Sequence, residues 1–262
     1  MNMQKRNSAK GNNRMGNLCK KYILTLLVTI VMTSLDIVAQ TKFSTCFYDC
    51  HRNRPIPVTV YAPKTMNANT VPVVFNHGYD GCKKINSNQD YEYLTEFLSL
   101  KGYYVISIQH DLPTDKLLAM DEPFMNSRMQ FWKKGVDNIR FVVEEFQKLM
   151  LDLDWKSLIL IGHSNGGDMV MLAATEYPNL ADKAISLDHR RMIIPRTAQP
   201  KIMTLRGCDY PADNGVLPSK SEQERYNIVV VDLDGIGHSD MCKNGTSEQH
   251  DRINKLIYDF IR

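Results

Sequence analysis

A serine between glycines stands where one apolar run of the sequence ends and a second, differently spaced one begins. The stretch "SLILIGHSNGGDMVML", residues 157–172, contains a G-x-S-x-G pattern centred on Ser164. On a tight strand-to-helix turn, a serine adopts a strained backbone that exposes its hydroxyl, and the glycines avoid collisions with the neighbouring strand and helix. The positive end of the following helix would stabilise an anion there. The pattern therefore predicts a nucleophilic serine if the chain supplies its partners.

A serine hydroxyl needs a base and an orienting acid to become a nucleophile. His238 is the predicted base, because the Gly-rich segment "DGIGHSDM" lets its ring reach the site. Asp209, after the strand-like "KIMTLRG", is the predicted acid. Two alternative acids stay open: Asp213 lies in the same loop as Asp209, and Asp188 follows the preceding strand. The order serine, acid, histidine is that of α/β-hydrolases.

The oxyanion of an acyl-transfer reaction needs backbone donors. We predict the N–H of Asn165, beside the serine, and the N–H of Tyr79, after the strand-like "VVFNHG". Each such donor is worth about 3 kcal/mol in the transition state. His77 is expected to shape this turn, and His163 is expected to pack behind the serine turn.

Alternating strand and helix patterns predict the fold class. Apolar, β-branched runs predict strands, and apolar residues three to four apart predict amphipathic helices. Such an alternation indicates an α/β fold, with a mostly parallel sheet of about eight strands and helices on both faces. The first two strands would form an antiparallel hairpin at one edge. Strands are expected at 44–49, 55–63, 71–78, 103–109, 157–162, 183–188, 201–207 and 227–233, and helices at 90–102, 136–150, 166–177, 219–226 and 246–262.

Residues 111–134 lack a clean period and contain two prolines and several methionines, so they are expected to form an irregular, cap-like excursion. Of these, Met120, Met125 and Met129 would line an acyl pocket or fill the core. In the last helix, Thr246 with Gln249 suits a capping box.

The motifs "NHG", "GHSNGG" and "GIGHSDM", together with the Asp209 loop, resemble the α/β-hydrolase superfamily. More narrowly, "DCHRNRPIPVTVYAP" feeding "VPVVFNHG" is similar to secreted hydrolases of the dienelactone-hydrolase and platelet-activating-factor-acetylhydrolase-like group. The resemblance covers residues 43–262. It implies ester or acyl hydrolysis of a small molecule with no metal or organic cofactor. Dienelactone hydrolases carry Cys where this chain carries Ser164, which favours esterase chemistry of the EC 3.1.1 class.

The first 39 residues differ in composition from the rest. A basic segment precedes the apolar run 22–32, and Ala39 offers a cleavage site, so we predict a secretory signal peptide followed by one domain, 40–262. An uncleaved membrane anchor over 22–39 is the alternative.

Six basic residues and Asp36 give residues 1–40 a charge of +5, which leaves −2 for the remainder of a +3 chain. This slightly acidic body gives no reason to expect nucleic-acid binding. After cleavage we expect no membrane association.

Five cysteines remain after residue 39, so at least one would be unpaired, and a bridge between Cys208 and Cys242 is one possibility.

Arginines follow the same strands as the candidate acids and would contact an anionic substrate, although exposed arginines more often pair with local carboxylates. They are Arg190, Arg191, Arg196 and Arg206.

Three functions are compatible with these residues. The first is an exported serine esterase that works through an acyl-enzyme. The second is a peptidase or amidase on the same triad, which usually needs a larger cap than residues 111–134 provide. The third is a binding protein that kept the fold without turnover. The oligomeric state does not follow from the sequence.

Overall fold

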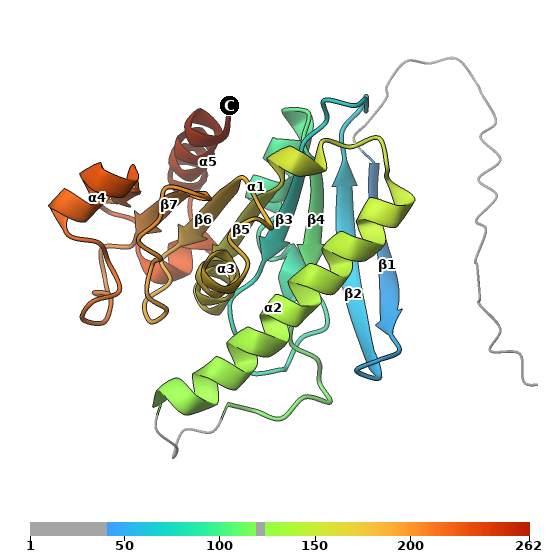
Figure 1. Ribbon diagram of the computed structural model, residues 1–262, viewed down its shortest axis with the longest axis horizontal. Helices are drawn as coiled ribbons and strands as arrows, with labels where there is room; N and C mark the ends of the chain where they lie inside the picture. Colours follow the sequence, from blue (N-terminus) through green and yellow to red (C-terminus); the bar gives the residue numbers. More distant parts are fainter. Residues whose placement is uncertain (1–40, 119–123) are drawn as a thin grey trace, which may run out of the picture. The chain divides into compact units, whose positions relative to one another are not determined.

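A single eight-stranded sheet forms the centre of the protein (Figure 1). The computed structural model describes residues 41–118 and 124–262. The strand order is β1-β2-β4-β3-β5-β6-β7-β8, and the strands from β3 to β8 run parallel. The bounds are β1 Thr41–Asp49, β2 Arg54–Ala62, β3 Pro72–Asn76, β4 Tyr104–Ile108, β5 Ile159–His163, β6 Lys183–Leu187, β7 Lys201–Arg206 and β8 Val229–Asp232. The predicted mostly parallel sheet is confirmed.

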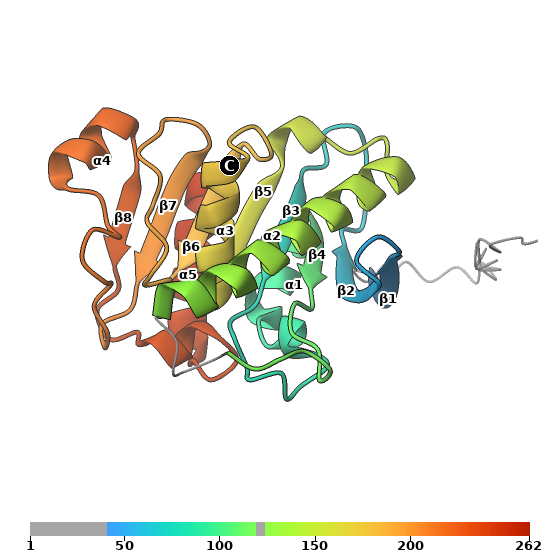
Figure 2. The ribbon, with the colours of Figure 1, turned by 60° about the horizontal axis from the view of Figure 1, so that its bottom comes forward.

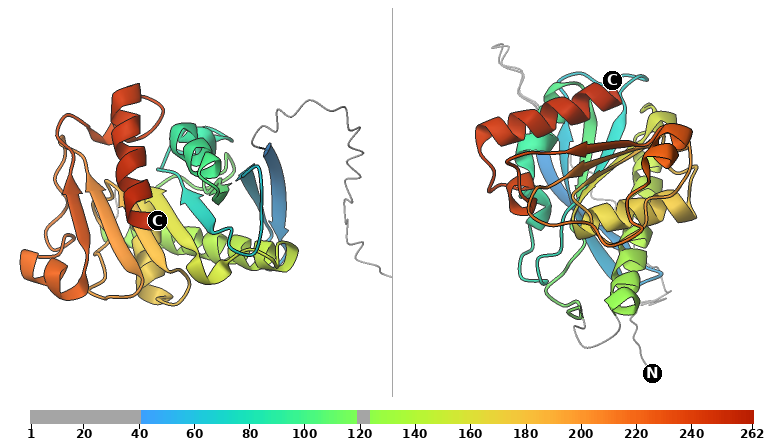
Figure 3. Two further views of the ribbon diagram at one scale, coloured as in Figure 1. Left: turned by 90° about the horizontal axis from the view of Figure 1, so that it is seen from above. Right: turned by 90° about the vertical axis from the view of Figure 1, so that its left-hand side faces the viewer.

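Helices cover both faces of this sheet (Figures 2 and 3). On one face, α2 and α3 enclose the larger apolar cluster, and on the other face α1 and α5 enclose the second cluster. The bounds are α1 Glu92–Leu100, α2 Phe124–Leu149, α3 Asn165–Glu176, α4 Lys220–Tyr226 and α5 Ser247–Ile261. Short 3-10 turns lie at Ser87–Gln89, Trp155–Ser157 and His238–Met241. None of the helices in the described ranges is both long and apolar enough to cross a membrane.

The composition of the strands follows their place in the sheet. Every residue of β3, β4 and β5 is buried, because helices cover both faces of these central strands. In contrast, β1 is an edge strand and is mostly exposed. It pairs antiparallel with β2 in the predicted hairpin. The edge position explains why β1 is the more polar of the two strands.

The start of α2 corrects one sequence-based expectation. The excursion predicted over 111–134 ends at residue 123, because α2 already begins at Phe124. Met129 is half-buried against the core and Trp132 is fully buried, and both continue the three-to-four spacing of the stripe that contains Val136. The methionines and prolines of this segment made its helical spacing hard to recognise in the sequence. The expected excursion is therefore limited to the segment before α2, of which 119–123 lie outside the described residues.

Side-chain caps fix the starts of two helices. Thr246 and Gln249 form the predicted capping box at α5, and Ser219 with Glu222 forms another at α4. The predicted signal segment, 1–39, lies outside the described residues.

The register of the parallel strands brings their carboxyl ends to one edge. His163 at the end of β5 is aligned with Leu187 at the end of β6, and Leu187 is aligned with Leu205 of β7. Residues that directly follow these strands therefore meet at a common rim, where open α/β sheets bind their ligands.

Candidate active site

Ser164 lies on the turn between β5 and α3, as the sequence predicts. Its backbone has φ 52° and ψ −121°, in the left-handed half of conformational space that non-glycine residues rarely adopt. Strain of this kind persists only where the surrounding structure enforces it. The turn therefore holds the half-buried serine at the end of the strand, where its hydroxyl lines a cavity as expected of a nucleophile.

The two glycines of the motif allow this turn to form. A Cβ at Gly162 would lie 2.3 Å from the carbonyl oxygen of Gly166 at the start of α3. A Cβ at Gly166 would lie 2.1 Å from the carbonyl oxygen of Asn76 in β3. Both clashes are with backbone, which cannot move aside, so the predicted need for glycine at both positions is confirmed.

His238 contacts Ser164 directly. It begins the 3-10 turn after β8, and its Nε2 lies 3.0 Å from the Ser164 Oγ. The same loop is fixed by Asp240, whose carboxylate accepts the N–H of Gly237 at 2.8 Å. The hydroxyl and the imidazole thus come together from segments 74 residues apart in the chain. A serine and a histidine at this distance can exchange a proton.

The carboxylate at the other side of the imidazole belongs to Asp188. Its Oδ2 lies 2.5 Å from Nδ1 of His238, and its side chain is 0% exposed. The choice of Asp209 as the acid that orients the imidazole is therefore not what the structure shows. Asp188 directly follows β6, which is the neighbour of β5, whereas Asp209 follows β7, one strand further from the serine.

Asp209 has a different contact with the same histidine. Its Oδ1 accepts the backbone N–H of His238 at 2.9 Å, and its side chain does not pair with the imidazole. Asp209 is exposed. The other alternative, Asp213, is also exposed and donates its backbone N–H to the Arg190 carbonyl. Asp209 thus fixes the backbone of the histidine loop, and Asp213 has no contact with the imidazole.

The surroundings of Asp188 keep its carboxylate charged. Burial alone would raise the pKa of Asp188, but the hydrogen bond from His238, the charge of Arg206 and the Gly207 N–H together lower it. Nη2 of Arg206 lies 2.9 Å from Asp188 Oδ1, an ion pair that is not aligned as a hydrogen bond. The Gly207 N–H donates to the same oxygen at 2.9 Å. A charged acid in this position favours the Nδ1–H tautomer of His238, which leaves Nε2 free to accept the serine proton.

A chain of hydrogen bonds joins three loops of the site. The Gly78 N–H donates to the hydroxyl of Tyr91 at 3.1 Å, so this hydroxyl donates in turn to Nδ1 of His163 at 2.8 Å. Nε2 of His163 then donates to the His238 carbonyl at 3.1 Å. Burial, and then the charge of His238, lower the pKa of His163 to about 3, so its ring is neutral. The loop before Tyr79, the serine turn and the histidine loop are therefore tied together.

The sequence analysis placed His163 behind the serine turn correctly, but it found no role for Tyr91. That residue directly precedes α1, where its spacing indicated only an apolar helix face. Nothing in the local sequence identifies its hydroxyl as a link, because one partner is in the loop after β3 and the other is at the end of β5.

The two predicted oxyanion donors flank the serine. Asn165 is the first residue of α3, where a backbone N–H has no carbonyl of its own helix to bind. On the other side, a Cβ at Gly78 would lie 3.2 Å from the Cβ of Ser164, so the turn that contains Tyr79 passes next to the serine. This position is compatible with Tyr79 as the second donor, which stays a prediction.

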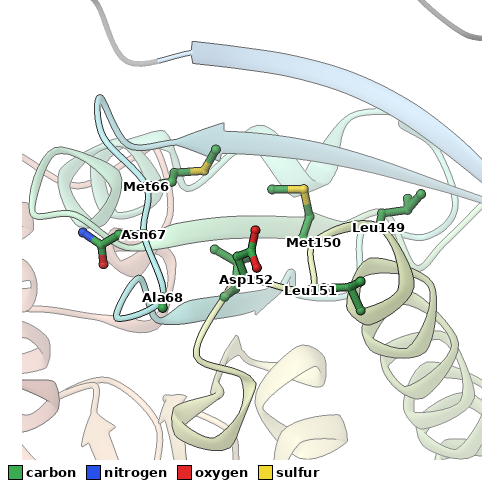
Figure 4. A pocket seen from close by; sticks show the side chains of 8 residues that line it. Met66, Asn67, Ala68, Leu149, Met150, Leu151 and Asp152 are labelled. Atoms are coloured by element: carbon green, nitrogen blue, oxygen red, sulfur yellow. The ribbon is translucent and has the colours of Figure 1, made fainter.

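A cavity of about 210 Å³ opens beside these residues. Its wall includes Ser164, His238, Tyr79 and Tyr91, together with the polar side chain of Asp80. A second cavity, of about 420 Å³, lies between the loop after β2 and the end of α2 (Figure 4). Met66, Leu149 and Leu151 line it, and Asp152 is its one ionisable side chain, with no histidine, serine or cysteine beside it in this lining. The smaller cavity is therefore the one with the means for chemistry.

Three further histidines, His77, His110 and His189, are packing residues. His77 is buried, with Nδ1 against the Gly78 carbonyl and Nε2 accepting the His110 N–H at 2.9 Å. His110 is fully buried against Asn76, and His189 is fully buried between Ser186 and the Met192 carbonyl. Burial, and then neighbouring positive charge, lower the pKa of His110 and of His189.

The cysteines, arginines and methionines that the sequence analysis singled out lie in different environments. All five cysteines in the described part of the chain are free thiols, so the possible bridge between Cys208 and Cys242 is not formed. Arg196 binds backbone carbonyls and Glu222, and Arg206 is buried against Asp188. Met125 is exposed, and Met120 lies outside the described residues.

One group of side chains has the composition of a cation site. Ligand atoms of Cys82, Asp111 and Asp115 lie within 4.8 Å of one another. The carboxylate of Asp115, however, already accepts hydrogen bonds from Arg54 and Lys134. Only Cys82 and Asp111 are left as free ligands, which is fewer than a protein zinc site uses.

Several solved structures share the architecture of this chain, although few of their residues are identical to it. An esterase from the archaeon Pyrobaculum calidifontis superimposes with a TM-score of 0.58 at 14% identity, over 84% of this chain and 82% of that one. Thermogutta terrifontis esterase 2, phosphorylated by paraoxon, gives 0.60 at 12% identity, over 84% and 94%. S-formylglutathione hydrolase from Staphylococcus aureus gives 0.57 at 14% identity, over 86% and 100%.

No family model and no curated protein matches the chain. The structural similarity nevertheless shows that the chain has the α/β-hydrolase fold, which confirms the expected fold class. The narrower resemblance to dienelactone-hydrolase-like enzymes stays a prediction.

Proposed function

We propose that the protein is an exported serine hydrolase that cleaves carboxylic esters of small molecules through an acyl-enzyme. The observation that carries the proposal is the continuous contact from Ser164 Oγ to His238 Nε2 and from His238 Nδ1 to Asp188, at 3.0 and 2.5 Å. Hydroxyl, imidazole and carboxylate in this order form the arrangement that activates serine in hydrolases. The solved structures of similar fold, which are described as esterases or as an S-formylglutathione hydrolase, support ester chemistry.

In the first half of the reaction, His238 takes the proton of Ser164 as Oγ attacks the ester carbonyl. Asp188 stabilises the imidazolium, with its own charge held by Arg206. The oxyanion is bound by the N–H groups of Asn165 and Tyr79. His238 then gives its proton to the departing alkoxide, and the acyl group stays on Oγ.

In the second half, His238 takes a proton from water and the resulting hydroxide attacks the acyl-enzyme. The bond to Oγ breaks, the carboxylic acid leaves, and the proton returns from His238 to Ser164. The neutral His163 behind the turn cannot compete as a proton acceptor, because its pKa is about 3 and both its ring nitrogens are bonded.

Covalent labelling tests this proposal. A fluorophosphonate should form one adduct on Ser164, located by peptide mapping, and Ser164→Ala should lose adduct and esterase activity together. The loss in kcat should be on the order of 10⁶-fold, as in other serine hydrolases. Ser221→Ala, on the exposed surface of α4, is the matched control and should behave like wild type. An unlabelled Ser164 in folded protein, or an active Ser164→Ala, would refute the proposal.

The same samples test two finer points. Comparison of p-nitrophenyl esters with p-nitroanilides separates an esterase from the peptidase or amidase alternative.

The proposal of export is supported by the basic start and the apolar run 22–32 of the sequence. Mass spectrometry of labelled protein from the producing cell should find it outside the cytoplasm without residues 1–39. A full-length chain in the membrane would instead support the anchor over 22–39.

A further inference from the structure

Arg190 lies on the loop that follows β6, two residues after Asp188. Its guanidinium lies over the ring of Tyr210, with Cζ 4.7 Å from the ring centroid. Its carbonyl accepts the Asp213 N–H at 2.9 Å, so the backbone is fixed as well. The side chain is half-buried. Stacking on an aromatic ring fixes the plane of a guanidinium while its N–H donors stay available to a ligand.

Within the described ranges, no carboxylate lies at ion-pair distance from Arg190. This separates it from two arginines of the original candidate group, since Arg206 pairs with Asp188 and Arg196 with Glu222. A half-buried guanidinium with no acid beside it has lost part of its hydration without a compensating charge. Such a group is suited to an anion that arrives with a ligand.

The loop that contains Arg190 is connected to the serine turn. Oδ1 of Asp168, in the first turn of α3, accepts the N–H groups of Arg191 and Met192 at 3.1 and 2.8 Å. The guanidinium is also near enough to lower the pKa of His163, whose ring centroid is 4.6 Å from that of His238. Arg190 thus lies on a loop that follows Asp188 and is tied to the first turn of the helix after Ser164.

Further positive charge comes from a second element. Arg128 of α2 is half-buried, and its pKa is lowered first by burial and then by the charges of Arg191 and Arg190. The same arginine influences the pKa of Tyr79, on the turn expected to supply an oxyanion donor. Guanidinium groups from α2 and from the loop after β6 therefore make this side of the rim positive, although the net charge beyond residue 40 is −2.

We propose that Arg190 binds a carboxylate on the substrate, so that the enzyme prefers esters that carry a negative charge. The inference rests on the proposed esterase function and names its substrate class. The carboxylate could be on the acyl group or on the alcohol, and the recognising chemistry is the same in both cases: a planar guanidinium donating two parallel hydrogen bonds.

Matched substrates test the preference. On the acyl side, mono-p-nitrophenyl adipate is compared with its methyl ester, which has the same length and no charge. On the alcohol side, 4-acetoxybenzoate is compared with methyl 4-acetoxybenzoate. Wild type should have a kcat/KM about 10- to 100-fold higher for the charged member of one pair, as expected for a charge-assisted hydrogen bond. Arg190→Gln should remove this ratio and leave the neutral ester unchanged, whereas Arg190→Lys should keep part of it.

Arg225 of α4 provides the matched control, since its guanidinium also lies over a tyrosine ring, that of Tyr226 at 5.3 Å. Arg225→Gln should keep the full ratio. High salt should reduce the ratio in wild type, because a partly exposed charge pair is screened. Normal fluorophosphonate labelling of Ser164 in each variant shows that the site is folded.

The outcomes separate the inference from the function on which it rests. A labelled, active enzyme with equal kcat/KM for both members of both pairs overturns the role of Arg190 and leaves the esterase proposal intact. A charge preference that survives Arg190→Gln also overturns it. The absence of both labelling and ester cleavage refutes the proposed function itself.

Discussion

Two loops at the same edge of the sheet each place an aspartate against His238, but the two aspartates bind different parts of this histidine. Asp188, after β6, is fully buried and binds the imidazole at 2.5 Å. Asp209, after β7, is exposed and binds the backbone N–H at 2.9 Å. Both follow apolar strands of similar length, and both are within reach of the same residue.

The difference between the two loops lies in their neighbours. β6 is next to β5, so the residue after β6 is beside the serine turn, and Arg206 from β7 lies behind it with a compensating charge. Removing a carboxylate from water is unfavourable unless it is paired. Of the two, only Asp188 has both the position against the imidazole and a paired charge. The comparison shows that strand adjacency, and not sequence distance from the histidine, decides which carboxylate meets the imidazole.

Replacement of Asp188 should give the largest effect. Asp188→Asn keeps the shape of the side chain but removes the charge that stabilises the imidazolium, and it leaves Arg206 buried without its partner. We expect kcat to fall by roughly 10⁴-fold, as when the acid of a serine triad is replaced by its amide. Steady-state hydrolysis of p-nitrophenyl acetate measures this, with circular dichroism as the check on folding. A loss of less than tenfold would assign the acid elsewhere.

A third aspartate, Asp168, extends the comparison to a carboxylate whose burial is only partly offset by its neighbours. Its pKa is raised to about 6, chiefly by burial, and its Oδ1 accepts two backbone N–H groups that an asparagine would still bind. Because the folded pKa lies above the unfolded one, the folded state binds more protons between about pH 4 and 6. Stability is therefore lost as pH rises through this window, by up to about 3 kcal/mol.

Asp168→Asn should remove this pH-dependent loss. The difference in the free energy of unfolding, variant minus wild type, should grow by as much as about 3 kcal/mol from pH 4 to pH 7. Urea titrations of both proteins at several pH values measure it, and contributions from other groups cancel in the difference. A difference that does not change with pH would contradict the raised pKa of Asp168.

Replacement of Asp209 should give the smallest effect. Asp209→Asn keeps an acceptor for the His238 N–H and removes only a negative charge at an exposed position. We expect kcat/KM to change by less than about tenfold, within the range of one hydrogen bond. The assay is that used for Asp188→Asn, so the two variants form a matched pair. If Asp209→Asn lost as much activity as Asp188→Asn, the distinction between the loops would be wrong.

The fold and part of the site could be predicted from the chain because their signals are local. Apolar spacing located the strands and most helices, and the glycines around Ser164 indicated a turn whose backbone contacts the structure confirms. Thr246 with Gln249 indicated the start of α5 for the same reason, since a capping box lies within one helical turn. His238 was also predicted, because it follows the last strand in a loop rich in glycine.

The errors arose where the signal was not local. The start of α2 was missed because Met129 and Trp132 reveal their spacing only once they are packed on the sheet. The hydroxyl of Tyr91 was missed because its partners are distant in sequence: Gly78 lies in the loop after β3, and His163 ends β5.

By itself, the sequence determined the alternation of strands and helices, the strained serine turn, and the set of polar side chains at the carboxyl ends of the strands. Only the tertiary structure decided which aspartate meets the imidazole and that Arg190 has no carboxylate of the described residues at ion-pair distance. The physical reason is that spacing along the chain controls backbone geometry and the face on which a residue lies. Pairing of charges depends on which strands become neighbours and on how deeply each group is buried.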